Sequence, residues 1–313
     1  MEKTSSFAQR EVIDSCANWI GAHAFTLLLM LFLITLGVIS ALWRLFELEL
    51  WSHEAVWRQR AFELPFVQLI RQRYPRVWRF FGARLAPDSY LGLHLTLGLL
   101  ITLAAMVGFG ALADAVADRE NLTRFDQQLA ISLHQNGTIA RVGIFEAITH
   151  FGDYRTLVCL GVAGSLILLV RRRWLLLLGW VVALAGSGFL NVLLKAFFQR
   201  VRPVFDNPWL TEPGWSFPSG HAMGSLVAYG MLAYVLIVDW RIPFPRTIVG
   251  LGIALVLAIG FSRIYLGVHF FSDVAAGFAA ALMWLAICVS GCEVARRRQQ
   301  MRRMPVNRRS SIS

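Results

Sequence analysis

The sequence predicts an all-α polytopic membrane protein, a helical bundle with a six-span core and an extra hydrophobic span near the N-terminus. Of its 313 residues, 57% are hydrophobic and 16% are charged, and the mean hydropathy is +0.56. This composition is too apolar for an ordinary soluble domain and is typical of chains that cross a bilayer several times. Long apolar runs also alternate with short polar connectors along most of the chain.

The excess of basic residues agrees with this class. Thirty Lys and Arg residues against 19 Asp and Glu residues give a formal net charge of +11. On a soluble protein this charge would suggest nucleic-acid binding. Here the arginines cluster in short segments beside apolar runs, as they do in cytoplasmic loops of membrane proteins. We find no nucleic-acid recognition motif, so we expect membrane lipids rather than nucleic acid as partners.

The first 90 residues contain one apolar run, at about residues 25–43, and a basic segment at 44–88. The apolar run predicts the extra span. The basic segment interleaves arginines with tryptophans, which favours amphipathic helices on the cytoplasmic membrane surface. A solvated basic loop is the alternative interpretation.

Further apolar runs predict the six core spans. Their approximate limits are 91–112, 156–170, 174–194, 221–238, 247–261 and 273–292. The polar stretch between the first two contains a turn at Asn136-Gly137, and we expect its Asp153, His150 and Arg155 to cap helices or lie at the membrane interface. We therefore divide the chain into residues 1–90, a core at 91–292 and a basic, disordered cytoplasmic tail at 293–313.

The distribution of arginine predicts the orientation of the spans. The segment 44–88, the connectors 171–173 and 239–246, and the tail are rich in arginine and are expected inside. Strict alternation then places the connectors 195–220 and 262–272 on the outer face. Seven spans put the N-terminus outside, whereas a re-entrant first run would leave six spans and an N-terminus inside. We predict the plasma or inner membrane of a bacterium, with the site on the periplasmic face.

Three segments place ionisable residues at the edges of apolar runs in these outer connectors. They are Lys195 to Arg202-Pro203, Pro218-Ser219-Gly220-His221, and Ser262-Arg263 to His269 and Asp273. Ionisable groups at such positions are costly in a membrane protein and are candidates for function.

The cations and the turn among these residues predict an anion site. Arg202 and Arg263 can each bind two phosphate oxygens, and Lys195 can add a point charge. Lys195 could instead extend its amine to the membrane surface without any binding role. The Pro218 to Gly220 turn enters a helix whose free amide groups can bind phosphate. A multiply anionic group, most simply phosphate, is the expected ligand.

The histidines add the chemistry of group transfer. His269 and Asp273 are four residues apart and share one face of a helix. A carboxylate on one imidazole nitrogen leaves the other nitrogen as a nucleophile or base. His221 can donate a proton to a leaving oxygen. We interpret the remaining histidines as interfacial residues; they are His23, His53, His94, His134 and His150.

Together the three motifs resemble the signature of the type 2 phosphatidic acid phosphatase (PAP2) and vanadium haloperoxidase superfamily. That signature is Lys, six residues, Arg-Pro; then Pro-Ser-Gly-His; then Ser-Arg, five residues, His, three residues, Asp. Every specified position is present here at the right spacing. The resemblance covers about residues 91–292, and the high hydrophobicity points to the integral-membrane lipid phosphatase branch.

The resemblance implies a metal-independent hydrolase of phosphoric esters or diphosphates with no cofactor. His269 would be the nucleophile that forms a phosphohistidine, Asp273 would orient it, and His221 would protonate the leaving group. The implied phosphate-binding residues are Lys195, Arg202, Ser219, Gly220 and Arg263.

The sequence does not choose the substrate, which we expect to be a lipid phosphate or diphosphate. By resemblance the candidates are undecaprenyl diphosphate, phosphatidylglycerol phosphate, phosphatidate and the lipid A phosphates. One alternative is a phosphotransferase that passes the phosphoryl group to an acceptor lipid, and a haloperoxidase is a more remote one. A non-catalytic lipid-phosphate-binding scaffold or transporter is the alternative outside enzymes. The histidines and Asp273 argue against it, because binding alone needs only the cations.

Overall fold

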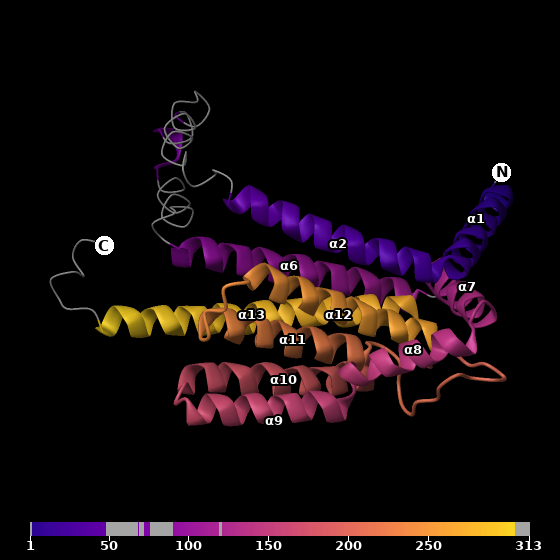
Figure 1. The fold of residues 1–313 in the computed structure, drawn as a ribbon. Helices are drawn as coiled ribbons and strands as arrows, with labels where there is room; N and C mark the ends of the chain where they lie inside the picture. The colour runs from indigo at the N-terminus through magenta and orange to yellow at the C-terminus, as the bar shows by residue number, and fades with distance from the viewer. Residues whose placement is uncertain (1, 48–67, 69–71, 76–89, 119–120, 304–313) are drawn as a thin grey trace.

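The computed structural model describes residues 2–47, 68, 72–75, 90–118 and 121–303, and within these ranges every regular element is a helix (Figure 1). This confirms the predicted all-α bundle. The elements are α1 (Glu2–Ala22), α2 (Ala24–Glu47), α6 (Tyr90–Ala117), α7 (Asn121–Gln135), α8 (Ile139–Thr149), a 3-10 turn (His150–Gly152), α9 (Tyr154–Val170), α10 (Trp174–Phe198), α11 (Gly220–Val238), α12 (Pro245–Tyr265) and α13 (Phe271–Arg303).

Six segments of the described chain are long and apolar enough to cross a membrane. They are 95–117, 139–170, 174–198, 220–238, 245–265 and 271–300. These are the six predicted core spans. The second is longer than expected, because α8 leads through the 3-10 turn into α9. Parts of α1 and α2 would supply a seventh span together, but they bend by 76° at their break, so the spanning and re-entrant interpretations of the N-terminal run both remain.

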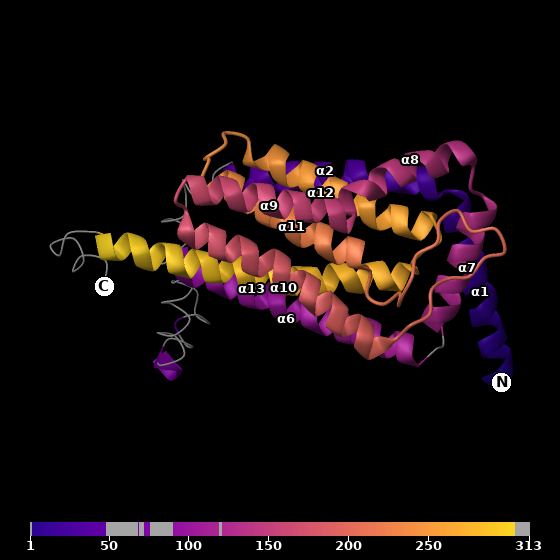
Figure 2. The same ribbon diagram turned by 90° about the horizontal axis from the view of Figure 1, so that it is seen from below.

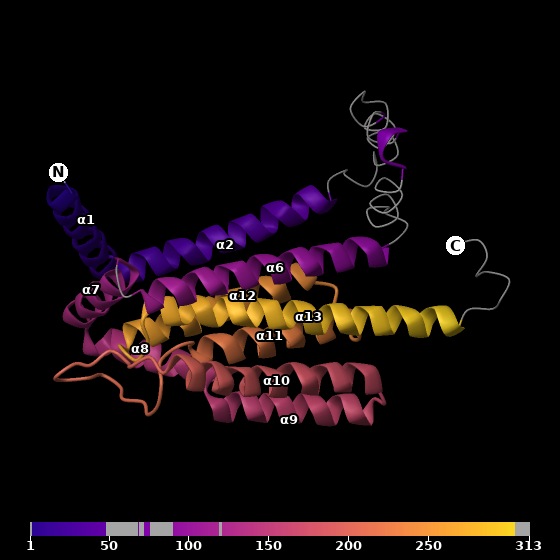
Figure 3. The same ribbon diagram turned by 180° about the vertical axis from the view of Figure 1, so that it is seen from behind.

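Helix α13 lies at the centre of the bundle and packs against α6, α10 and α11 (Figures 1 and 3). Small residues allow this packing, since Ala276, Ala280 and Ala281 of α13 are almost completely buried. Helix α12 contacts α2, α8 and α11, and α9 packs on α10 and α11. Many large apolar side chains of α6, α9 and α10 remain exposed on the outside of the bundle, as expected for surfaces that face lipid.

The connectors fall at two opposite ends of the bundle (Figures 1 and 2). The basic connectors 171–173 and 239–244 lie at the end where α13 finishes. Asp239 forms ion pairs there with Arg171 at 3.2 Å and with Arg173 at 2.6 Å. The loop 199–219 and the turn 266–270 lie at the other end, next to α7. The alternation assumed from the arginines is therefore consistent with the fold, and the side of the membrane stays a prediction.

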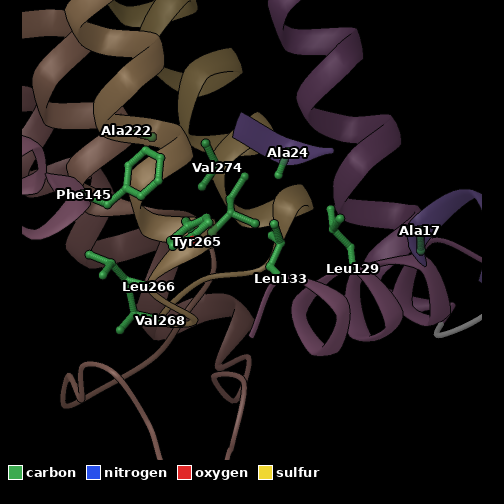
Figure 4. Packing of buried hydrophobic residues seen from close by; sticks show 11 residues of the cluster. Ala17, Ala24, Leu129, Leu133, Phe145, Ala222, Tyr265, Leu266, Val268 and Val274 are labelled. Atoms are coloured by element: carbon green, nitrogen blue, oxygen red, sulfur yellow. The ribbon is translucent and has the colours of Figure 1, made fainter. Parts of the chain in front are cut away.

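A hydrophobic cluster supports the turn that carries His269 (Figure 4). Leu266 and Val268 of the turn are buried, together with Tyr265 of α12 and Phe145 of α8. Gly267 has φ +72°, and a Cβ there would lie 2.8 Å from a ring carbon of Phe205. Glycine is therefore required at this turn, both for its backbone conformation and for the close contact.

Two expectations for the chain ends concern regions that are described only in part. Most of the basic segment 44–88 lies outside the described residues. At the other end α13 continues through residues 293–303, where we expected a tail. Glu293 is buried and bonds Arg296 at 2.6 Å and Arg297 at 3.2 Å, and such pairs at helical spacing extend the helix. Residues 304–313 lie outside the described residues.

The predicted orientation can be tested by labelling in a cysteine-free background. We expect Cys at position 207 (Asn207→Cys) to react with a membrane-impermeant thiol reagent in intact cells, because the loop 199–219 should face the periplasm. Cys at position 172 (Arg172→Cys) should react only after permeabilisation. The opposite labelling pattern would reverse the topology.

Candidate active site

The residues singled out by the three motifs converge at one end of the bundle. Lys195 lies in the last turn of α10 and Arg263 in the last turn of α12. His221 lies in the first turn of α11, and Asp273 in the first turn of α13. A cavity of about 860 Å³ opens among these helix ends. Its polar lining includes Lys195, Arg202, Glu212, Gly220 and His221.

His269 and Asp273 form the predicted pair. Nδ1 of His269 lies 3.3 Å from Oδ2 of Asp273, and the same oxygen accepts a hydrogen bond of 2.9 Å from the Phe270 amide. Both side chains are almost completely buried. The hydrogen bond from the Phe270 amide holds the carboxylate on the Nδ1 side of the imidazole ring, so Nε2 points away from Asp273.

The environment of His269 favours a neutral ring with a lone pair on Nε2. Nη1 of Arg202 lies 3.1 Å from Nε2. Because a guanidinium can only donate, Nε2 accepts and the ring proton belongs on Nδ1, facing Asp273. Burial, followed by the positive charges of Arg202 and Arg263, lowers the pKa of His269 well below its ordinary value. An unprotonated Nε2 directed at the cations has the form needed of a nucleophile.

The two motif arginines differ in how far their side chains are buried, Arg202 being 11% and Arg263 1% exposed. Arg202 donates to the Val268 carbonyl at 2.8 Å and to the Gly214 carbonyl at 3.1 Å. Arg263 is fully buried, and its Nη1 donates to Thr149 at 2.7 Å. Its Nε is buried without a partner among the described residues. A buried donor without an acceptor is costly, and a phosphate oxygen would satisfy it.

A carboxylate of the chain itself lies between these arginines. Glu212, from the loop 199–219, accepts a short hydrogen bond from Nη2 of Arg263 and lies 3.3 Å from Nη1 of Arg202. Burial opposes its ionisation, but the charge of Arg263 prevails and holds the pKa of Glu212 below its ordinary value. Glu212 therefore places a negative charge where the resemblance predicts phosphate.

The start of α11 provides further donors. Ser219 is the N-cap residue; its hydroxyl accepts from the Ala222 amide at 3.5 Å, and its own amide donates to the Asp273 carbonyl at 2.9 Å. The amides of Gly220 and His221 have no acceptor in the part of the chain that is described. They line the cavity and are suited to an anion. Ser219 is fully buried and its hydroxyl caps the helix; its contact with phosphate stays a prediction.

His221 has a partner that the motifs do not contain. Its Nε2 lies 2.8 Å from Oδ1 of Asp153, and the other oxygen of Asp153 lies 2.7 Å from Nδ1 of His150. We expected Asp153 to cap a helix or lie at the interface. It does occupy the N-cap position of α9, but its side chain makes no capping bond. Its carboxylate instead contacts both imidazoles, because the 3-10 turn packs against α11 and places Asp153 near the start of that helix.

The sequence did not indicate a role in the site for four residues at this end of the bundle. They are Glu212, Asp153, Arg200 and Asp126. A carboxylate close to an apolar run was a usable signal for Asp126 and Asp153. Arg200 lay at an unspecified position inside the first motif, where its type carried no information. Nothing in the pattern distinguished Glu212 from other loop carboxylates.

Comparisons with known proteins place this arrangement in a family. Residues 174–296 match the family model described as "PAP2 superfamily". Phosphatidylglycerophosphatase B of Bacillus subtilis is 34% identical over 145 residues, which are 45% of this chain and 70% of that protein. The chain belongs to the PAP2 superfamily. The predicted resemblance is therefore confirmed, and the matched region contains all three PAP2 motifs.

Other PAP2 proteins agree with this assignment. An undecaprenyl-diphosphatase of Sulfolobus acidocaldarius is 29% identical and covers 49% of this chain and 72% of its own length. The crystal structure of a transmembrane PAP2 type phosphatidylglycerolphosphate phosphatase from Bacillus subtilis superposes with a TM-score of 0.56 and 28% identity. That alignment covers 62% of this chain and 96% of the other. This PAP2 chain is thus an integral membrane phosphatase, a hydrolase that acts on phosphate esters.

Glu212 generates a prediction about anion binding at this PAP2 site. The variant Glu212→Gln removes the negative charge from between Arg202 and Arg263 with little change of shape. We expect orthophosphate to bind on the order of tenfold more tightly, since a charge-assisted hydrogen bond is worth about 1.5–3 kcal/mol. Competitive inhibition by orthophosphate measures the effect. Glu146→Gln, an exposed change on α8, is the control; weaker binding in Glu212→Gln would mean that Glu212 holds the arginines in place.

Proposed function

We propose that this protein removes a terminal phosphate from a membrane lipid phosphate or diphosphate through a phosphohistidine at His269. The observation that carries the proposal is the shape of the 860 Å³ cavity. One end holds Lys195, Arg202 and His221, and the remainder runs between α9, α10 and α11 past Leu157, Leu166 and other aliphatic side chains. A phosphate joined to a long apolar chain fits both parts.

In the first step of the proposed reaction, Nε2 of His269 attacks phosphorus while the bond from phosphorus to the lipid oxygen breaks. His221 gives its proton to that departing oxygen. The negative charge that spreads over the other phosphoryl oxygens is stabilised by Lys195, Arg202 and Arg263 and by the amides at the start of α11. Asp273 stabilises the positive charge that develops on the imidazole of His269.

In the second step a water molecule attacks the phosphohistidine and His221 takes up the proton that the water loses. The bond between phosphorus and Nε2 breaks, orthophosphate leaves, and both imidazoles return to their starting forms. If an acceptor lipid hydroxyl replaced water, the same intermediate would yield a phosphotransferase. The chemistry uses protein cations throughout, so we propose that no metal ion is required.

The substrate is proposed only as a class. Relatives named for phosphatidylglycerophosphate and for undecaprenyl diphosphate act on different lipids at similar identity. The apolar part of the cavity is lined mostly by aliphatic side chains, together with Tyr154 and Trp180, which suits acyl and prenyl chains alike. Because the site is expected at the outer end of the bundle, we propose the periplasmic leaflet of the bacterial inner membrane as the source of substrate.

The first test asks for lipid-dependent phosphate release and a covalent intermediate. Detergent-solubilised protein should release orthophosphate from at least one of phosphatidylglycerol phosphate, undecaprenyl diphosphate and phosphatidate, with excess chelator present. Acid-labile label should appear on the protein with a labelled substrate. His269→Ala should abolish both, with a loss of at least about 10³-fold, as expected for a covalent catalyst.

His23→Ala is the control for this test, since His23 lies at the break between α1 and α2 and does not line the cavity. An acceptor lipid in a parallel reaction separates transfer from hydrolysis. Activity of His269→Ala above about a tenth of wild type would rule out the nucleophile assignment, and a requirement for added magnesium would rule out the metal-independent mechanism.

The second test asks whether the apolar part of the cavity binds the lipid chain. Gly188 lines this part, and a Cβ there meets no atom within 4 Å. We expect Gly188→Leu to lower kcat/KM for a long-chain lipid phosphate by at least about 10-fold, the lower end of the effect of one misfitted methylene group. It should leave kcat/KM for p-nitrophenyl phosphate unchanged.

Gly108→Leu is the matched control, because Gly108 of α6 also has open space and does not line the cavity. It should change neither activity. Equal losses of Gly188→Leu on the lipid and on p-nitrophenyl phosphate would show that this groove does not hold the chain.

A further inference from the structure

The first motif contains a second arginine, Arg200, whose side chain points away from the residues proposed to bind phosphate. It does not line the 860 Å³ cavity that holds Lys195 and Arg202. Its Nη1 donates to Oδ1 of Asp273 at 2.6 Å and to the Ser272 hydroxyl at 2.7 Å. Arg200 therefore contacts the carboxylate behind His269.

This contact gives the Asp273 carboxylate a positively charged partner. Its side chain is fully buried, and its two oxygens are used differently: Oδ2 faces His269 and the Phe270 amide, and Oδ1 accepts from Arg200. A buried carboxylate is costly unless it is paired and hydrogen-bonded. Within the described chain, Arg200 is the cation that hydrogen-bonds Asp273.

Arg200 is itself held from several sides. Its Nη2 donates to Oδ2 of Asp126 on α7 at 2.9 Å, and its guanidinium lies 4.4 Å from the centre of the Phe270 ring. Its carbonyl accepts from the Ser216 amide at 2.8 Å. The side chain is 11% exposed. A planar guanidinium suits such a bridge between two carboxylates, and an ammonium group does not.

Asp126 is specialised for this bridge. It is completely buried and also accepts a bond of 3.1 Å from the Ser272 amide and a short bond from the Ser272 hydroxyl. Burial raises the pKa of Asp126, and the bonds from Ser272 and Arg200 oppose that shift. Asp126 thus joins α7 to the first turn of α13 and keeps Arg200 on the far side of Asp273.

We propose that Arg200 and Asp126 are positioning residues for the reaction. Arg200 supplies the counter-charge of Asp273 and aims its carboxylate at Nδ1 of His269, and Asp126 keeps Arg200 on Asp273 and out of the phosphate site. Neither residue touches the phosphoryl group. The inference rests on the proposed phosphohistidine chemistry, and it extends the site to α7, outside the matched region 174–296.

The test separates positioning from phosphate binding in the full-length, solubilised protein. Two quantities are measured: the single-turnover rate of phosphoenzyme formation, and the inhibition constant of orthophosphate. We expect Arg200→Gln to lower the rate by about 10–100-fold, the loss found when the partner that orients a functional imidazole is removed. The affinity for orthophosphate should stay within about twofold, as for changes outside a binding site.

Three comparison variants make the result specific. Arg202→Gln should weaken orthophosphate binding, and Arg155→Gln, an exposed change at the start of α9, should alter neither quantity. Arg200→Lys keeps the charge but cannot bridge both carboxylates, so its rate should fall between those of wild type and Arg200→Gln. An unchanged rate in Arg200→Gln, or a loss of orthophosphate affinity equal to that of Arg202→Gln, would overturn the proposal.

A double-mutant cycle asks whether Arg200 acts through Asp273. In the Asp273→Asn background, adding Arg200→Gln should change the rate by less than about threefold, because the contact is already lost. Multiplicative losses would overturn the proposal. If Arg200→Gln does not fold, Asp126→Asn carries the test: it should slow phosphoenzyme formation with orthophosphate affinity unchanged, and a wild-type rate would overturn the proposal. A wild-type protein that forms no phosphoenzyme would refute the proposed function itself.

Discussion

The Asp273 carboxylate is completely buried at the end of an apolar bundle, and two separate parts of the chain provide the three groups that contact it. Arg200 comes from the loop after α10, the Phe270 amide from the turn before α13, and His269 from the same turn. A buried carboxylate is stable only with such partners. The positions of the loop, the turn and the first turn of α13 therefore depend on one another, and the imidazole of His269 is fixed as a consequence.

On the Nε2 side of His269 lies Arg202, which also lines the cavity. Lys195 lines the same cavity, Arg263 is buried beside Glu212, and the carboxylate of Glu212 offsets these charges in part. Each cation is costly near the membrane, and the protein compensates with loop carbonyls, Thr149 and Glu212. Because positive charge remains in excess, the site attracts a phosphate group. The same excess explains why Glu212 and the loop carbonyls pair with the cations when no phosphate is bound.

The N-terminal helices contribute to this end of the bundle although they lie outside the matched family region. Helix α1 packs against α7, and Arg124 of α7 donates to Asp14 of α1 at 2.8 Å. Helix α7 in turn carries Asp126 to Arg200 and to the start of α13. Helix α1 is thus connected to the surroundings of Asp273 through one packed helix, although no residue of α1 lines the cavity.

The sequence by itself determined the helical membrane fold, the six core spans and the cluster of His221, His269 and Asp273, because hydrophobic run length and motif spacing are local properties of the chain. It also determined which cations would converge, since their motifs lie at the ends of neighbouring spans. Only the tertiary structure decided that Arg200 turns to Asp273, that Asp153 reaches His221, and that Glu212 lies between two arginines. The pairs Arg263–Glu212, His221–Asp153 and Arg200–Asp273 are separated by 51, 68 and 73 positions in the chain. Their pairing depends on how helices pack and on which buried charges need compensation, which no local pattern encodes.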